Sequence, residues 1–168
     1  MTDEFLSSPI GFGFDLQSLG SGSTNVWTGD IDSGTTLDIK PAFGNILQLD
    51  GTISTKDSTP VQVVDFGTAV FNGSFSNVRT LSVFSGTAEV NGILSAAANP
   101  FVNTNRTLAG TGTLTWTSTS PAVIRGTIDP GTNAGATAGR TMDSVLFETR
   151  GGFSAQRIGT VPGTQSGH

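Results

Sequence analysis

The chain has 168 residues, 23 glycines, no cysteine and a formal net charge of −5, and only 12% of its residues are charged. Apolar residues occur throughout, which predicts a folded chain rather than a disordered one. The lack of cysteine excludes disulfides and thiolate chemistry, the acidic balance argues against a nucleic-acid partner, and no window is apolar enough for a membrane helix. The N-terminal residues carry acids and no apolar run, so we expect no export signal and synthesis in a cytoplasm.

Residues 1–40 are predicted to form an extended N-terminal arm. Glycine and serine recur every few positions, and neither helical nor sustained strand periodicity is present. The segment nevertheless has too many apolar side chains for a solvated tail, so we expect it to lie on a partner. The predicted partner-binding residues are Phe5, Ile10, Phe12, Phe14, Leu16 and Trp27. The alternative is that the segment contributes the first strand of the domain's own sheet.

Residues 41–150 are predicted to form one all-β domain, followed by an extended C-terminal tail over residues 151–168. Short runs such as NILQLDGTIST and VQVVDFGTAVF place Val, Ile, Leu, Phe or Thr at alternate positions between Gly, Asn, Asp or Pro. Gly-Thr pairs recur at intervals of 16–24 residues, close to the length of one solenoid turn. This spacing favours a short parallel β-helix, with a β-sandwich or barrel as the alternative fold.

Residues 107–135 resemble the rungs of autotransporter passenger domains. The segments TLAGTGTLTW and GTIDPGTNAG have the Leu-x-Gly-x-Gly strand and the Pro-Gly turn of those rungs. The resemblance implies a right-handed parallel β-helix in which Leu108 and Leu114 point inward, Gly110 and Gly112 allow close backbone approach, and Pro130-Gly131 forms a corner. Passenger domains belong to longer exported chains with a membrane barrel, so we expect a self-contained solenoid here.

A short, charge-poor β-helix with an apolar arm resembles the cement or decoration proteins of tailed-bacteriophage capsids. The resemblance implies a structural virion protein without a cofactor that forms a homotrimer. Its partner would be the major capsid protein on the outer surface of the shell, with no membrane or nucleic acid involved. The alternative function is a glycan-binding adhesin or tail-associated β-helix, with Trp116 as a candidate contact.

The sequence offers little catalytic or metal-binding chemistry, so we expect no enzyme. The only histidine is the terminal His168, which cannot be oriented as a catalytic base. Carboxylates that could cut polysaccharides are Asp50, Asp65, Glu89 and Asp129, and Asp50 and Asp65 stand one predicted rung apart; turn formation is the preferred interpretation. Asp30, Asp32 and Asp38 lie in a segment similar to the start of a calcium loop, but the required glycine and glutamate are missing, so we expect no metal.

Overall fold

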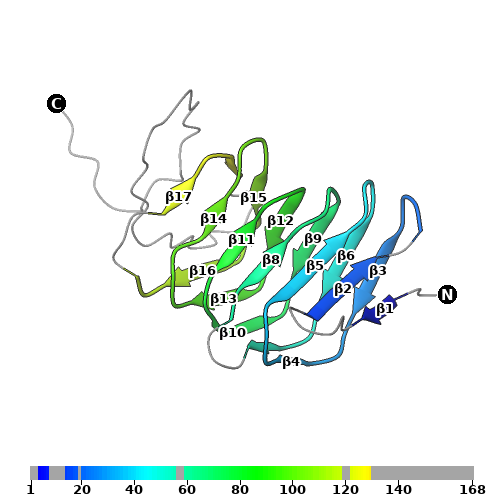
Figure 1. Cartoon of the computed structure of the whole chain (residues 1–168), viewed down its shortest axis with the longest axis horizontal. Coiled ribbons are helices and arrows are strands. Elements are labelled where there is room, and N and C mark those ends of the chain that lie inside the picture. Colours follow the sequence, from blue (N-terminus) through cyan, green and yellow to red (C-terminus); the bar gives the residue numbers. More distant parts are fainter. Residues whose placement is uncertain (1–3, 8–13, 19, 56–58, 119–121, 130–168) are drawn as a thin grey trace.

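A computed structural model describes residues 4–7, 14–18, 20–55, 59–118 and 122–129 of the chain. Over these residues the chain winds as a β-solenoid of about five turns, with the three strands of each turn lying in three different sheets (Figure 1). The predicted parallel β-helix is therefore confirmed, and the sandwich and barrel are excluded. The described residues contain no helix, and so no helix that could span a membrane.

We name the sheets A, B and C in the order in which a turn meets them. Sheet A contains β1 (Glu4–Ser7), β2 (Phe14–Ser18), β5 (Leu37–Pro41), β8 (Val61–Val63), β11 (Leu81–Val83), β14 (Phe101–Val102) and β17 (Val123–Ile124). Sheet B contains β3 (Thr24–Trp27), β6 (Ile46–Leu49), β9 (Thr68–Phe71), β12 (Thr87–Val90), β15 (Thr107–Ala109) and β18 (Thr127–Asp129). Sheet C contains β4 (Ile31–Ser33), β7 (Ile53–Thr55), β10 (Ser74–Val78), β13 (Ile93–Ala96) and β16 (Thr113–Trp116).

Successive turns stack in parallel register, with one exception at the N-terminal end. Thr68, Thr87, Thr107 and Thr127 are aligned in one row across sheet B, and similar rows run through the other sheets. Strand β1 instead runs antiparallel to β2. Because β1 hydrogen-bonds to the outer edge of β2, it covers the N-terminal edge of sheet A, and an uncovered edge would be open to pairing with another chain.

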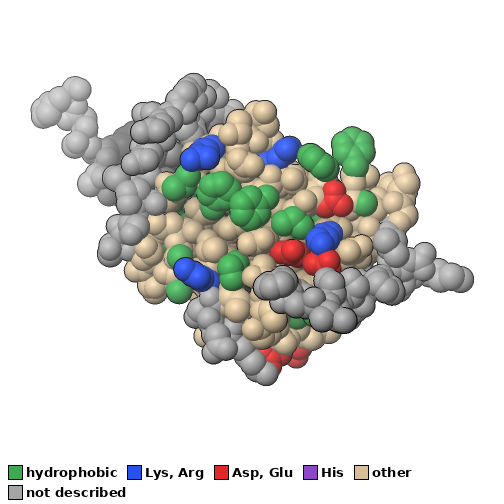
Figure 2. Space-filling model, in the orientation of Figure 1, with side chains coloured by type: hydrophobic (Ala, Val, Ile, Leu, Met, Phe, Trp, Pro, Cys, Tyr) green, Lys and Arg blue, Asp and Glu red, His purple; other side chains and the backbone are tan. Residues whose placement is uncertain are grey.

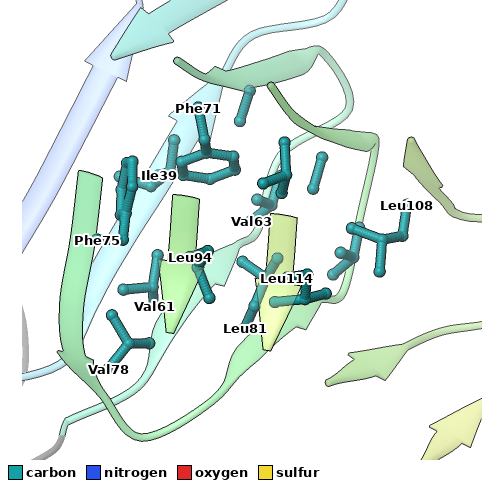
Figure 3. Close-up of a cluster of buried hydrophobic side chains, with 14 of the residues drawn as sticks. Ile39, Val61, Val63, Phe71, Phe75, Val78, Leu81, Leu94, Leu108 and Leu114 are labelled. Atoms are coloured by element: carbon teal, nitrogen blue, oxygen red, sulfur yellow. The ribbon is translucent and has the colours of Figure 1, made fainter. Parts of the chain in front are cut away.

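In most strands from β2 to β17, alternate side chains point into the narrow interior, where Figure 3 shows a cluster of apolar side chains. One inward row of sheet A is Leu16, Ile39, Val63, Val83, Val102 and Ile124, and all six are buried. Ile53, Phe75, Leu94 and Leu114 form the corresponding row of sheet C. In the middle turn Phe71 and Phe75 meet edge to face across a corner, with ring centroids 5.0 Å apart. The predicted inward placement of Leu108 and Leu114 is confirmed.

A row of glycines lines the corner between sheets B and C. A Cβ atom on Gly73 would lie 1.8 Å from the carbonyl oxygen of Gly51, and one on Gly92 would lie 2.0 Å from that of Gly73. Gly112 repeats the relation to Gly92 at 2.1 Å, which agrees with the close approach predicted for it. Consecutive turns can therefore stack at this corner only because no side chain separates them.

The first turn of the solenoid begins within the segment predicted to be an arm. Residues 14–18 and 20–41 contain β2 to β5, and Leu16 in β2 is fully buried. The physical reason is that Leu16 alternates with Asp15 and Gln17, so one face of β2 completes the apolar interior and the other does not. The predicted C-terminal tail, residues 151–168, and the end of the predicted domain, residues 130–150, lie outside the described residues.

Candidate interaction surface

The carboxylates considered for catalysis are distributed over different parts of the solenoid. Asp50 follows β6 at the corner between sheets B and C, whereas Asp65 follows β8 at the corner between sheets A and B. A strand of sheet B separates these corners, so the spacing of one turn does not bring the two carboxylates to the same corner. Asp65 accepts a hydrogen bond from the backbone N–H of Phe66 at 2.8 Å, which is the turn-forming role expected for it. Glu89 lies in β12 and Asp129 in β18.

The segment similar to a calcium loop is divided among three structural positions. Asp30 accepts a hydrogen bond from the backbone N–H of Thr52 at 2.9 Å, Asp32 lies in β4 and Asp38 in β5. The described residues contain no group of three or more acidic side chains that could hold a metal ion. The carboxylate oxygen of Asp30 is used to join two turns at a corner.

A small charged cluster lies at the N-terminal end of the outer face of sheet A. Asp15 and Asp38 are directly opposite one another on β2 and β5, and the Nζ atom of Lys40 lies 2.5 Å from Asp15 Oδ2. Burial raises the pKa of Asp38 above its ordinary value, and the negative charge of Asp15 adds to the rise while Lys40 opposes it. Asp38 Oδ1 is buried without a hydrogen-bond partner. The cluster thus contains one carboxylate that is destabilised in its charged form.

Of the residues predicted to bind a partner through the arm, three belong to the body of the solenoid. Leu16 is fully buried, while Phe14 and Trp27 pack against the core and are partly buried. The indole N–H of Trp27 donates to the carbonyl of Gly29 at 2.8 Å. Phe5 lies in β1, and Ile10 and Phe12 lie outside the described residues. Phe14, Leu16 and Trp27 therefore serve mainly to hold the first turn together.

The most distinctive surface feature is a row of phenylalanines that we call the aromatic stripe: Phe43, Phe66, Phe84 and Phe101. Phe43 and Phe66 follow β5 and β8 at the corner between sheets A and B, and they are 84% and 57% exposed. Phe84 follows β11 on the outer side of sheet A, and its ring lies 5.3 Å from that of Phe101. Figure 2 shows apolar side chains gathered in a band along this face.

Positive charges flank the C-terminal half of the aromatic stripe. The guanidinium carbon of Arg106 lies 5.1 Å from the ring centroid of Phe66, and its Nε–H donates to the carbonyl of Phe84 at 3.3 Å. Arg125 follows β17 and is exposed. A cation–π contact thus joins Phe66 to Arg106 on a different turn. A row of aromatic rings with cations beside it can bury apolar area against a partner and orient that partner by charge.

Sequence reasoning did not identify the aromatic stripe. Its members are separated by 17–23 residues, so no local motif joins them. The available signal was that Phe43 and Phe66 each stand directly before a glycine that follows a strand, which is a corner position where a large side chain must point outward. Trp116, the predicted glycan contact, is partly buried and packs against the core instead.

Comparison of the chain with protein-family models, with curated proteins and with solved structures finds no match. The function is therefore inferred from the geometry of the aromatic stripe and the solenoid that carries it.

Proposed function

We propose that the chain is a structural virion protein of the capsid cement class. In this proposal it binds the major capsid protein across capsomer junctions on the outer surface of a phage head, and it performs no catalysis. The observation that carries the proposal is the aromatic stripe, in which Phe43, Phe66 and Phe84 are exposed and Phe101 is half-buried on the solenoid. Burying one large apolar side chain contributes about 1.5–3 kcal/mol, so several rings buried together can hold a subunit on a shell without a deep pocket.

The solenoid suits such a role because its strands form a stiff, continuous ladder. Neighbouring turns are about 4.8 Å apart, so rings on successive turns lie at spacings fixed by the backbone. The backbone that carries the rings is preorganised, so binding orders only the ring side chains, and this preserves more of the energy of burial as affinity. The binding residues are thus Phe43, Phe66, Phe84 and Phe101, with Arg106 as a polar contact at the edge.

The segment that precedes β2 retains its predicted role in this proposal. Phe5, Ile10 and Phe12 extend the apolar contact to the shell or to neighbouring subunits, and the protein assembles as a homotrimer. Three subunits would bring three aromatic stripes to one junction and raise the effective affinity through multivalency. Native mass spectrometry of the purified chain measures this state, and a monomer at every tested concentration would contradict the trimer.

A second candidate function, glycan binding, rests on the same aromatic stripe. Aromatic faces beside a cation are a surface to which sugar rings can stack, and the stripe lies along one side of the molecule as that function requires. Glycan binding predicts measurable affinity for polysaccharides that is lost with the stripe, and it requires no protein shell. Affinity electrophoresis in polysaccharide gels therefore separates the two candidates.

The experiment that tests the cement function is cosedimentation with capsid shells of the virus that encodes the chain, assembled without it. The test variant is Phe43→Ser/Phe66→Ser/Phe84→Ser, and the matched control is Ile93→Ser, which removes a 55% exposed apolar side chain from sheet C. We expect the chain and the control to bind at a fixed number of copies per capsomer and the triple variant to lose binding. Absence of binding by the unaltered chain, or full binding by the triple variant, would refute the proposal.

A further inference from the structure

Two Asn-Gly sequences lie at the corner between sheets B and C, on consecutive turns. Asn72-Gly73 joins β9 to β10, and Asn91-Gly92 joins β12 to β13. Asparagine followed by glycine is the arrangement most prone to spontaneous deamidation, because glycine has no side chain to hinder attack by its own backbone nitrogen on the asparagine amide. Asn72 is exposed and Asn91 is half-buried, so water has access to both.

The nitrogen that would attack is hydrogen-bonded at both sites. The backbone N–H of Gly73 donates to the carbonyl of Leu49 at 3.1 Å, and that of Gly92 donates to the carbonyl of Phe71 at 2.9 Å. In each pair the N–H of the asparagine itself donates to the same carbonyl, at 2.9 Å. The two backbone amides of the turn are thus fixed on one oxygen of the preceding turn. Rotation of the glycine nitrogen toward the side chain requires both bonds to break.

The asparagine side chains are also fixed, in a polar ladder of Asp50, Asn72, Asn91 and Thr111. The Nδ2 group of Asn72 donates to Asp50 at 2.8 Å, and that of Asn91 donates to Asn72 at 3.2 Å. Asn91 donates further to Glu89 at 2.8 Å, and its Oδ1 accepts from the backbone N–H of Thr111 at 3.2 Å. The side-chain amides of Asn72 and Asn91 are therefore fixed by these hydrogen bonds, which must be released before Cγ can be attacked.

We infer that Asn72 and Asn91 are deamidation sites gated by opening of the solenoid turns, so that modification marks chains whose turns have separated. In an opened turn the glycine nitrogen loses its proton and forms a bond to Cγ of the asparagine, while the Cγ–Nδ2 bond breaks and ammonia leaves. Water then opens the resulting succinimide and yields aspartate or isoaspartate. This inference does not depend on the proposed function, because no residue of the aromatic stripe lies at the corner between sheets B and C.

The products do not fit the corner from which they arise. An aspartate at position 72 would place a second carboxylate against Asp50, where an amide N–H now donates. An isoaspartate lengthens the backbone by one carbon, at a corner where even a Cβ atom on Gly73 would overlap the carbonyl of Gly51. Modification in an opened turn therefore hinders its closure, and damaged chains accumulate in the opened state.

The experiment measures deamidation of each site in the full chain by peptide mapping and mass spectrometry. The chain is incubated at mildly alkaline pH in native buffer and in concentrated urea, beside a synthetic peptide of residues 69–76. We expect Asn72 in urea to react at the rate of the peptide, and Asn91 to react at a similar rate because it has the same Asn-Gly sequence. In native buffer we expect them to react at least about tenfold more slowly, because local opening of a packed strand is infrequent.

Two variants in β13 test whether deamidation requires opening of the solenoid turn. Leu94→Ala leaves a cavity beside the turn that carries Asn91, whereas Ile93→Ser changes only an outward side chain of the same strand. Leu94→Ala should accelerate native-state deamidation severalfold and Ile93→Ser should not; Leu94→Val replaces the alanine variant if that chain fails to fold. Equal rates in native buffer and urea, or equal rates in the two variants, would overturn the inference.

Discussion

Substituting Gly73 by alanine tests whether the turns stack at the corner between sheets B and C by direct backbone contact. The new Cβ atom would lie 1.8 Å from the carbonyl oxygen of Gly51. Ordinary contact begins near 3.4 Å, so the turn must move by about 1.6 Å, a third of the ~4.8 Å spacing between turns. Such overpacking costs about 3 kcal/mol, and the reduced entropy of the unfolded chain returns up to ~1 kcal/mol. The net loss is about 2 kcal/mol.

The assay is urea and thermal unfolding monitored by the fluorescence of Trp27 and Trp116, both of which pack against the core. A loss of about 2 kcal/mol corresponds to a fall in Tm of about 4–8 °C for a chain of this length. Gly34→Ala is the matched control, because its Cβ atom would meet no atom within 4 Å and should stabilise the chain by about 0.4–1 kcal/mol. If Gly73→Ala unfolds within about 0.5 kcal/mol of the unaltered chain, the stacking argument is wrong.

Three further predictions concern single side chains. Asp38→Asn should raise the urea midpoint at neutral pH. The pKa of Asp38 is raised in the folded state, so ionisation of this carboxyl lowers the stability of the fold as pH rises above the ordinary pKa of 3.8. The gain from the substitution should therefore vanish in acid. Phe75→Ala should cost about 3–5 kcal/mol by leaving a cavity, whereas Phe43→Ala, at an exposed site, should change unfolding by less than about 0.5 kcal/mol. Asn45→Ala should cost about 1–3 kcal/mol in urea unfolding, since Asn45 is buried, donates to the carbonyl of Gly20 at 3.0 Å and accepts from the N–H of Ser23 at 3.2 Å.

The solenoid could be predicted because its interior is narrow and uniform. Each strand needs alternate apolar residues, and each turn needs glycine where backbones meet, so the sequence repeats at the length of a turn. The Gly-Thr pairs do not mark one corner, however. Those at Gly67, Gly86 and Gly126 open strands of sheet B, whereas those at Gly51 and Gly110 lie at the corner between sheets B and C. Both corners impose the same close backbone approach, so the pair alone cannot distinguish them.

The extent of the first turn and the position of the aromatic stripe could not be predicted from local patterns. The glycine-rich and serine-rich segment before Thr24 gives few periodic positions, and Leu16 is recognisable as an interior residue only when its register with Ile39 is known. The aromatic stripe likewise exists only through stacking, since Arg106 reaches Phe66 from two turns away. The corner at which each carboxylate lies could not be predicted for the same reason, because a separation of one turn does not say at which corner a residue lies.

The two corners beside sheet B differ in what their side chains are free to do. At the corner between sheets B and C, the segments that join the strands are short, and the side chains of Asn72 and Asn91 form hydrogen bonds to residues of neighbouring turns. At the corner between sheets A and B, the stacking contacts are made by backbone atoms at Gly67 and Gly86, and Phe66, directly before Gly67, is 57% exposed. Large side chains that lie outside the core are the ones available for a partner, and for this reason the aromatic stripe, rather than the polar ladder, is the surface on which binding should be sought.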